Sequence, residues 1–331
     1  MSEKMADGRS GEDRLIAKFF APIAVDPGAL GLADDAAFLK PPPGCELVLK
    51  TDAIVGGVHF FTDDAPQSVA GKALRVNLSD LAAKGARPLG FLLSLALPKD
   101  IDDDWLTGFA EGLRGDALLF SCPLFGGDTV RTPGPVMISI AMVGSVPEGT
   151  MVRRAGAQPG DKIFVSGSIG DAALGLALRK GAQWKLSEAH RQHLTSRYLL
   201  PQPRAALAEA VRTHASSAMD VSDGLVGDFT KLCRVSGVAA EIAAHKVPLS
   251  DAAKAVIASE PAMLETAFTG GDDYEILCTV RPSKAESFRS AAQAARVVVT
   301  EIGEIKAGEG VGFLDAAGNA LSFQHASFSH F

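Results

Sequence analysis

Apolar and polar residues along the first half of the chain follow two spacings, one typical of β-strands and one typical of amphipathic helices. Helical patterns lie at 65–86, where Leu74, Leu78 and Leu81 share one face, and at 100–120, where acids occupy the first turn. Strand-like apolar segments lie at 45–52, 89–98 and 135–146. The spacing therefore predicts alternating strands and helices up to about residue 146.

The alternation stops at 147–161, "PEGTMVRRAGAQPGD", which is rich in glycine, proline and arginine. It restarts at 162–178, where "KIFVSGSIGDAALGLAL" predicts a strand, a glycine turn and a helix. Further strands are predicted at 238–244, 272–280 and 295–305, and a helix at 284–295. We expect a mixed α/β (α+β) protein with a flexible leader and two domains, at residues 1–12, 13–148 and 149–331.

Composition and charge narrow the class of protein. The chain has 331 residues, of which 47% are hydrophobic, and a formal net charge of −7. A nucleic-acid surface would need a basic patch, and no apolar run approaches the ~20 residues of a membrane span. The N-terminus is too polar for a signal peptide, and the four cysteines stand far apart in apolar contexts. We therefore expect a cytoplasmic protein with no nucleic-acid or membrane partner.

Aspartates recur where strands are predicted to end. Asp52 ends the first strand, Asp128 follows two glycines, and Asp220 and Asp223 lie where the strand in "SSAMDVSDGL" gives way to a helix. Each has an ordinary explanation, because aspartate forms turns, and Asp223 or the preceding serine could cap the helix. Taken together, these aspartates offer several carboxylate oxygens, beside glycines, that could bind a cation.

Three further acids extend this set. Asp34 and Asp35 precede a short apolar segment, 36–39, that predicts another strand. Asp80 lies on the first long helix, where Lys84 one turn later could pair with it on a solvated face. Oxygen ligands without a histidine–cysteine cluster favour magnesium or calcium, and of the two magnesium commonly bridges carboxylates and phosphates. We therefore expect a nucleotide-dependent enzyme.

Phosphate-binding motifs give weaker evidence for a nucleotide site than the aspartates do. The chain has no GxxxxGK[ST] loop. The segment "SGSIGDAALG" leaves two alternatives open, a phosphate loop at a helix N-terminus or only a tight turn.

Six segments carry a resemblance to a known family: "ADDAAFL", "TDAIVGGVHF", "GKALRVNLSDLAAKGARP", "GGDTVRTPG", "AMDVSDGLVGD" and "FTGGDDYEIL". In this order and spacing they resemble the thiamine-monophosphate kinases of the aminoimidazole ribonucleotide synthetase superfamily, over about residues 33–331. The resemblance implies a two-domain PurM-like fold, with an N-terminal dimerising domain, a C-terminal α/β domain and a cleft between them. It also implies a homodimer that transfers the γ-phosphoryl group of ATP to thiamine monophosphate, assisted by several Mg²⁺ ions, in the last step of thiamine diphosphate biosynthesis.

The resemblance also implies roles for individual residues. The expected magnesium ligands are Asp35, Thr51, Asp52, Asp80, Asp128, Asp220 and Asp223. Among them, Asp52, Asp80 and Asp220 are expected to contribute most to catalysis. The expected ATP contacts are Gly127, Asp128, Arg154 and Ser222, and the expected substrate contacts are His59, Glu275 and Phe328. Asp228 is expected to be no more than a polar helix residue.

Two positions depart from the family pattern. Lys50 stands where threonine or serine is usual, and it projects to the same side of the predicted strand as Asp52. Its ammonium group could displace one ion or contact phosphate, which leaves the number of metals open. Ala110 stands where a tyrosine is usual near the nucleotide, so an adenine contact stays unassigned.

Other functions remain as alternatives. An enzyme of the selenophosphate synthetase type carries a reactive cysteine or selenocysteine in a glycine-rich N-terminal segment, which is not seen in this sequence. A purine synthetase differs mainly in substrate, and "GGVHF" and the aromatic tail favour thiamine phosphate over it. A non-catalytic binder of metal and nucleotide would not need so complete a set of acids.

Overall fold

The computed structural model describes residues 10–325 and 327, which fall into two compact units. The first unit contains the described residues up to Asn77 together with Pro88–Ser145, and the second contains Leu78–Arg87 and the residues from Val146 onward. Helix α2 (Pro66–Ala83) therefore contributes to both units.

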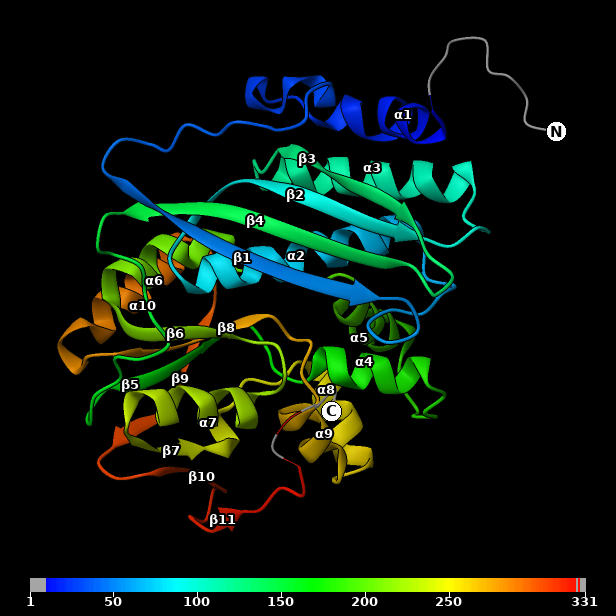
Figure 1. Ribbon diagram of the computed structural model, residues 1–331. Coiled ribbons are helices and arrows are strands. Elements are labelled where there is room, and N and C mark those ends of the chain that lie inside the picture. The colour runs from blue at the N-terminus through cyan, green and yellow to red at the C-terminus, as the bar shows by residue number, and fades with distance from the viewer. Residues whose placement is uncertain (1–9, 326, 328–331) are drawn as a thin grey trace. The chain divides into compact units, whose positions relative to one another are not determined.

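The first unit is built on a four-stranded sheet with the strand order β1-β4-β2-β3 (Figure 1). Its strands are β1 (Cys45–Val55), β2 (Arg87–Leu97), β3 (Leu124–Arg131) and β4 (Met137–Pro147). Besides the first part of α2, its helical segments are α1 (Gly11–Leu15), η1 (Ile16–Phe20), η2 (Ala21–Ile23), η3 (Pro27–Leu32) and α3 (Asp103–Leu119).

Local chemistry explains where two of these helices begin. Asp102 caps α3 by accepting a hydrogen bond from the backbone N–H of Trp105 at 2.9 Å, as expected for a helix with acids at its start. Helix α1 begins at Gly11, inside the expected leader, because Ser10 accepts from the backbone N–H of Asp13 at 3.0 Å. The strand expected at 36–39 does not form among the described residues.

The two faces of this sheet differ in burial. Phe91, Leu93 and Leu95 of β2 are buried on one face, and alternate residues of β4 join them. The opposite face exposes large apolar side chains, namely Leu47, Leu49, Leu92, Val130 and Met137. The sheet therefore presents an apolar face to solvent in the single chain, which is unusual for a protein that stays monomeric.

The second unit is built on a seven-stranded sheet with the order β11-β10-β7-β9-β5-β8-β6, in which β10 and β7 are parallel and the other neighbours antiparallel (Figure 1). Its strands are β5 (Lys162–Ser166), β6 (Ala215–Val221), β7 (Ala239–Ala243), β8 (Glu275–Val280), β9 (Val299–Lys306), β10 (Gly310–Leu314) and β11 (Ala320–Leu321). Besides the end of α2, its helical segments are α4 (Asp171–Arg179), α5 (Glu188–Leu199), η4 (Ala205–Leu207), α6 (Ala208–His214), α7 (Leu225–Ser236), η5 (Ala244–Lys246), α8 (Asp251–Ser259), α9 (Met263–Thr269), η6 (Pro282–Lys284) and α10 (Ala285–Ala294).

Helices cover both faces of the central strands of this sheet. Ile163 and Val165 of β5 lie in one apolar core with side chains of α4, α5, α7, α8 and α9. Phe164 between them lies in a second core with side chains of α6 and α10. Burial on both faces explains why these strands appear in the sequence as nearly continuous apolar runs. No described helix of the chain is long and apolar enough to cross a lipid bilayer.

Candidate functional site

Strand β1 carries the first of the expected metal ligands. Asp52 lies inside this strand, because β1 runs on to Val55 instead of ending at Asp52 as predicted. Alternation places Lys50 and Asp52 on the face of the buried Val48, and Thr51 on the opposite face. The Lys50 Nζ lies 3.0 Å from Asp52 Oδ1, which confirms that Lys50 faces Asp52. An ion held by Asp52 is therefore within reach of Thr51 only through a backbone oxygen.

Asp128 lies at the other edge of the same sheet. It is an exposed residue inside β3, paired in register with Ser94, and not at a strand end as predicted. The preceding Gly127 has no room for a side chain, since a Cβ would lie 1.7 Å from the carbonyl oxygen of Leu93. Two strands separate β1 from β3, so at a spacing of about 4.8 Å the two edges lie roughly 14 Å apart. Asp52 and Asp128 of one chain are too far apart to share one ion.

Other predicted residues of the first unit are placed separately. Asp35 is exposed in a bend after η3, and Ala110 is buried in α3. His59 follows β1, and its Nδ1 accepts a hydrogen bond from the backbone N–H of Val55 at 3.0 Å. The neutral ring then carries its proton on Nε2. The buried Lys72 donates to the carbonyl oxygen of His59 at 3.0 Å, which fixes this turn.

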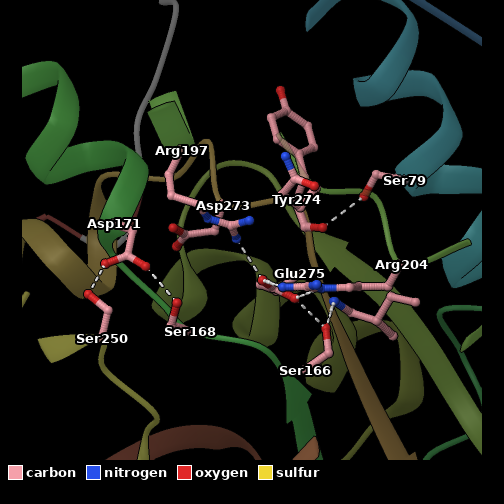
Figure 2. A network of polar contacts seen from close by, with 12 residues as sticks. Ser79, Ser166, Ser168, Asp171, Arg197, Arg204, Ser250, Asp273, Tyr274 and Glu275 are labelled. Carbon is pink, nitrogen blue, oxygen red and sulfur yellow. Dashed lines mark hydrogen bonds and ion pairs between the residues drawn. The ribbon is translucent and has the colours of Figure 1, made fainter. Parts of the chain in front are cut away.

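In the second unit, the end of α2 is tied to strands β6 and β8. Lys84 Nζ donates to the carbonyl oxygen of Ala218 at 2.7 Å. Ser79 Oγ donates to the carbonyl oxygen of Tyr274 at 3.3 Å (Figure 2). Asp80 lies between these two anchors and is half-buried. These contacts bring Asp80 to the part of the second unit where β6 ends.

Two further predicted residues, Asp220 in β6 and Arg154 beside it, lie near the end of this strand. Asp220 is 5% exposed and lies two residues beyond Ala218. The backbone N–H of Ala218 donates to the carbonyl oxygen of Arg153 at 3.0 Å, so the neighbouring Arg154, which is exposed, runs beside this strand. Asp80, Arg154 and Asp220 are thus grouped by the fold of the second unit alone.

Asp228 organises the loop between β6 and α7. Helix α7 begins after Gly224, and no described side chain caps it. Asp228 Oδ2 instead accepts the backbone N–H groups of Ser222 at 2.9 Å and Asp223 at 2.8 Å. Burial raises the pKa of Asp228 against the opposing effect of Lys231. The alternative explanation, that Ser222 or Asp223 caps the helix, is therefore excluded, and the expectation of an ordinary polar Asp228 was wrong.

Lys231 joins the carboxylate of Asp223 in this loop to that of Asp228 in α7. Its Nζ lies 2.5 Å from Asp223 Oδ2 and 2.9 Å from Asp228 Oδ1. Burial alone would lower the pKa of Lys231, but its hydrogen bonds to Asp223 and Asp228 outweigh burial and raise it. The lysine therefore stays cationic, and its position beside Asp223 was not foreseen from the sequence.

Glu275, an expected substrate contact, is fully buried at the start of β8. Arg204 donates to both of its oxygens, from Nε to Oε2 at 2.6 Å and from Nη2 to Oε1 (Figure 2). Arg197 Nη2 donates to Oε1 at 2.7 Å, and Ser166 Oγ donates to Oε2 at 2.6 Å. In this structure the carboxylate is enclosed by protein groups, and its role as a substrate contact stays a prediction.

A side chain occupies the anion position at the start of α4, in the segment "SGSIGDAALG". The backbone N–H of Gly170 donates to Asp273 Oδ1 at 3.0 Å and Oδ2 at 2.9 Å. Burial raises the pKa of Asp273 well above its ordinary value, although the hydrogen bond from Gly170 opposes this. The first helical residue, Asp171, is also buried, and it accepts hydrogen bonds from Ser168 at 2.6 Å and from Ser250. These contacts favour the tight turn over the phosphate loop.

Three other kinds of site bear on the chemistry of the described residues: a metal cluster, a reactive thiol and a cavity. Within residues 10–325 and 327, no group of three or more His, Cys, Asp or Glu side chains could hold a metal ion. Phe328 lies outside the described residues. The four cysteines are free, and burial raises the pKa of Cys122 and of Cys233 to about 12 each, which argues against a reactive thiolate there. A cavity of about 480 Å³ in the first unit, lined in part by Pro22 and Arg114, contains none of the predicted residues.

Known proteins match the chain over nearly its whole length. Two family descriptions match, AIR synthase related protein, N-terminal domain, at residues 33–146 and the corresponding C-terminal domain at residues 158–315. The thiamine-monophosphate kinase of Caulobacter vibrioides is 45% identical over 300 residues, which cover 89% of this chain and 84% of that relative.

Solved structures give similar matches. The crystal structure of thiamine-monophosphate kinase from Stenotrophomonas maltophilia K279a is 37% identical and superposes with a TM-score of 0.82, covering 93% of this chain and 96% of that one. A structure described as AaThiL complexed with AMPPCP and TMP is 33% identical, with a TM-score of 0.78, and the match covers 90% of this chain and 91% of that one.

Proposed function

This chain belongs to the thiamine-monophosphate kinase family of AIR synthase related proteins, and we propose on that basis that it phosphorylates thiamine monophosphate with ATP, giving thiamine diphosphate and ADP. The observation that carries the proposal is the 45% identity to a kinase of this name over 84% of that kinase's length. The similar structure with AMPPCP and TMP supports the same pair of substrates, because AMPPCP is an analogue of ATP.

Magnesium is the metal that the donor set fits, because all the expected ligands are oxygens. Magnesium ions in the first unit would be held by Asp35, Asp52, Asp128 and the backbone of Thr51. Magnesium ions in the second unit would be held by Asp80 and Asp220. When bound, magnesium neutralises the charge of the phosphates that react. Arg154, exposed beside β6, adds a fixed cation for the nucleotide.

The reaction requires positioning more than covalent chemistry from the protein. In phosphoryl transfer the attacking and leaving oxygens must lie in line, and the charge must be neutralised. The acceptor is itself a phosphate that is largely ionised at neutral pH, with a second pKa near 6. No strong general base is therefore needed, and the phosphoryl group passes directly between the substrates without a phosphoenzyme.

A homodimer is part of this proposal. The uncovered face of the four-stranded sheet exposes Leu47, Leu49 and Leu92, and exposed apolar faces of this kind mark protein–protein contacts. Asp52 and Asp128 lie on opposite edges of that sheet, and a two-fold dimer that sets the β1 edge of one copy beside the β3 edge of the other would bring one copy's Asp128 near the other copy's Asp52. Each magnesium site of the first unit would then be shared by two chains.

Mixing two inactive variants tests the shared site. Asp52→Asn and Asp128→Asn are coexpressed with different tags, and the hybrid dimer is purified. A hybrid has one site with both changes and one intact site, so the purified hybrid should regain roughly half of wild-type activity. If hybrids purified through both tags stay as inactive as their parents, the two residues act within one chain or not together.

The activity itself is tested by measuring ADP release with thiamine monophosphate, selenide or formylglycinamidine ribonucleotide as the second substrate. We expect ADP and thiamine diphosphate in equal amounts with thiamine monophosphate and Mg²⁺, and little ADP with the other two compounds. The Asp220→Asn protein is the matched control for contaminating kinases, because it should lose the activity while staying folded. Faster ADP release with either of the other compounds would refute the proposed substrate.

A further inference from the structure

In the second unit the carboxylate of Asp223, an expected magnesium ligand, is engaged by an ammonium group. Lys231 Nζ lies 2.5 Å from Asp223 Oδ2 and 2.9 Å from Asp228 Oδ1, so it bridges two carboxylates as a divalent ion would. Lys231 extends from the second turn of α7, and its side chain is 32% exposed. A cation of the protein therefore already contacts the Oδ2 oxygen of Asp223.

Asp228 fixes this arrangement from the buried side. Its side chain is 1% exposed, and Oδ2 is held by the backbone N–H groups of Ser222 and Asp223. Oδ1 is thereby directed at Lys231 and cannot turn away without leaving two N–H groups without their acceptor. The lysine has a rigid anchor on one side and the more exposed Asp223 on the other.

The Lys231 ammonium group competes with a magnesium ion for the carboxylate of Asp223, because it already contacts the Oδ2 oxygen. Magnesium binds carboxylate oxygens at about 2.1 Å and requires near-octahedral surroundings, whereas the ammonium group already fills one side of Asp223. A magnesium ion on the same carboxylate would also be repelled by the positive charge of the Lys231 ammonium group.

We infer that the Lys231 ammonium group takes the place of the metal ion expected at Asp223, so that Asp223 and Asp228 position a lysine and not a magnesium ion. The inference rests on the proposed function only for the expectation of an ion at Asp223. The chain then binds one divalent ion fewer than a protein in which Asp223 is free to bind metal. Lys231 is a positioning residue that supplies a permanent positive charge next to the loop of Ser222.

Counting bound Mn²⁺ tests this inference without turnover. Mn²⁺ accepts the same oxygen ligands as Mg²⁺, and the free ion is quantified by electron paramagnetic resonance in the presence of AMPPCP. Lys231→Met should bind one more Mn²⁺ per chain than the wild type, and adding Asp223→Asn to it should remove that ion again. Lys231→Arg, which keeps the charge, should bind the wild-type number.

Two further variants make the result decisive. Asp223→Asn alone should leave the wild-type number unchanged, and a lost ion would overturn the inference even if Lys231→Met fails to fold. Lys254→Met in α8 is the matched control, because Lys254 forms an exposed pair with Asp251 at 3.3 Å. Equal numbers of ions in folded Lys231→Met and wild type would also overturn the inference. ADP release by the wild type is measured separately, so a failure of the proposed function is distinguished from a failure here.

Discussion

Replacing Glu275 separates its two possible roles, as a contact for the substrate or as the centre of a buried ion network. The carboxylate has no exposed surface and accepts hydrogen bonds from Arg197, Arg204 and Ser166. Glu275→Gln keeps the size of the side chain but removes the charge that two guanidinium groups share. The network would be left with two cations and one neutral acceptor.

The burial of the two arginines indicates how much stability the Glu275→Gln change should cost. The side chains of Arg197 and Arg204 are 10% and 24% exposed, so little water reaches them to replace the lost carboxylate. Removing one partner of a buried ion pair typically costs 3–5 kcal/mol, and we expect the free energy of unfolding to fall by about that amount. An exposed pair supplies the control, since Glu286→Gln beside Arg289 should cost less than about 1 kcal/mol.

Urea denaturation followed by circular dichroism measures this difference, and steady-state kinetics are run on the same preparations. We expect a clearly lower urea midpoint for Glu275→Gln and a wild-type midpoint for Glu286→Gln. An unchanged midpoint combined with a raised KM for thiamine monophosphate would refute the reasoning from burial. It would show that Glu275 leaves the arginines to contact the substrate, as the family resemblance implies.

Four other changes have defined outcomes. Asp80→Asn should lower kcat roughly a hundredfold without changing the melting temperature, and near-normal turnover at saturating Mg²⁺ would exclude Asp80 as a ligand. Lys50→Thr should lower the Mg²⁺ concentration needed for half-maximal activity, whereas superimposable titrations would show that its pairing with Asp52 does not affect metal binding. Asp228→Ala should cost about 2–5 kcal/mol in urea denaturation and Asp228→Asn about 1 kcal/mol, since only asparagine retains an acceptor for the loop amides; equal losses would contradict this. Phe328→Ala should raise the KM for thiamine monophosphate several-fold and leave that for ATP unchanged, and a lower melting temperature with an unchanged KM would indicate a packing role instead.

Periodicity predicted most of the strands and helices, because they bury apolar side chains at the spacing of their own backbone. β2, α3 and β4 all lie within or close to the segments expected from the sequence. Alternation also placed Lys50 and Asp52 on one side of β1 before any contact was known. These predictions depend on local geometry alone, which a single sequence contains.

Asp52 and Asp128 show where local rules fail. Both were expected at strand ends, since aspartate is depleted from strand interiors and common in turns. Both strands instead continue past the acid, because β1 and β3 are the edges of their sheet, where a polar side chain is not enclosed by strands on both sides. Edge position is a property of the strand order, and the strand order depends on contacts that the sequence does not display.

Asp228 could have been recognised from its place on the helix. Leu225, Phe229 and Leu232 of α7 are fully buried and recur at helical spacing, and Asp228 follows Leu225 by three residues, so it shares their face. An acid on a buried face must have partners, because an unpaired charge there is very costly. The nearest donors without helical partners are the backbone N–H groups just before the helix, and Asp228 accepts two of them. A buried acid in the first turns of a helix thus predicts a fixed loop ahead of it, and in this chain that loop carries Ser222 and Asp223.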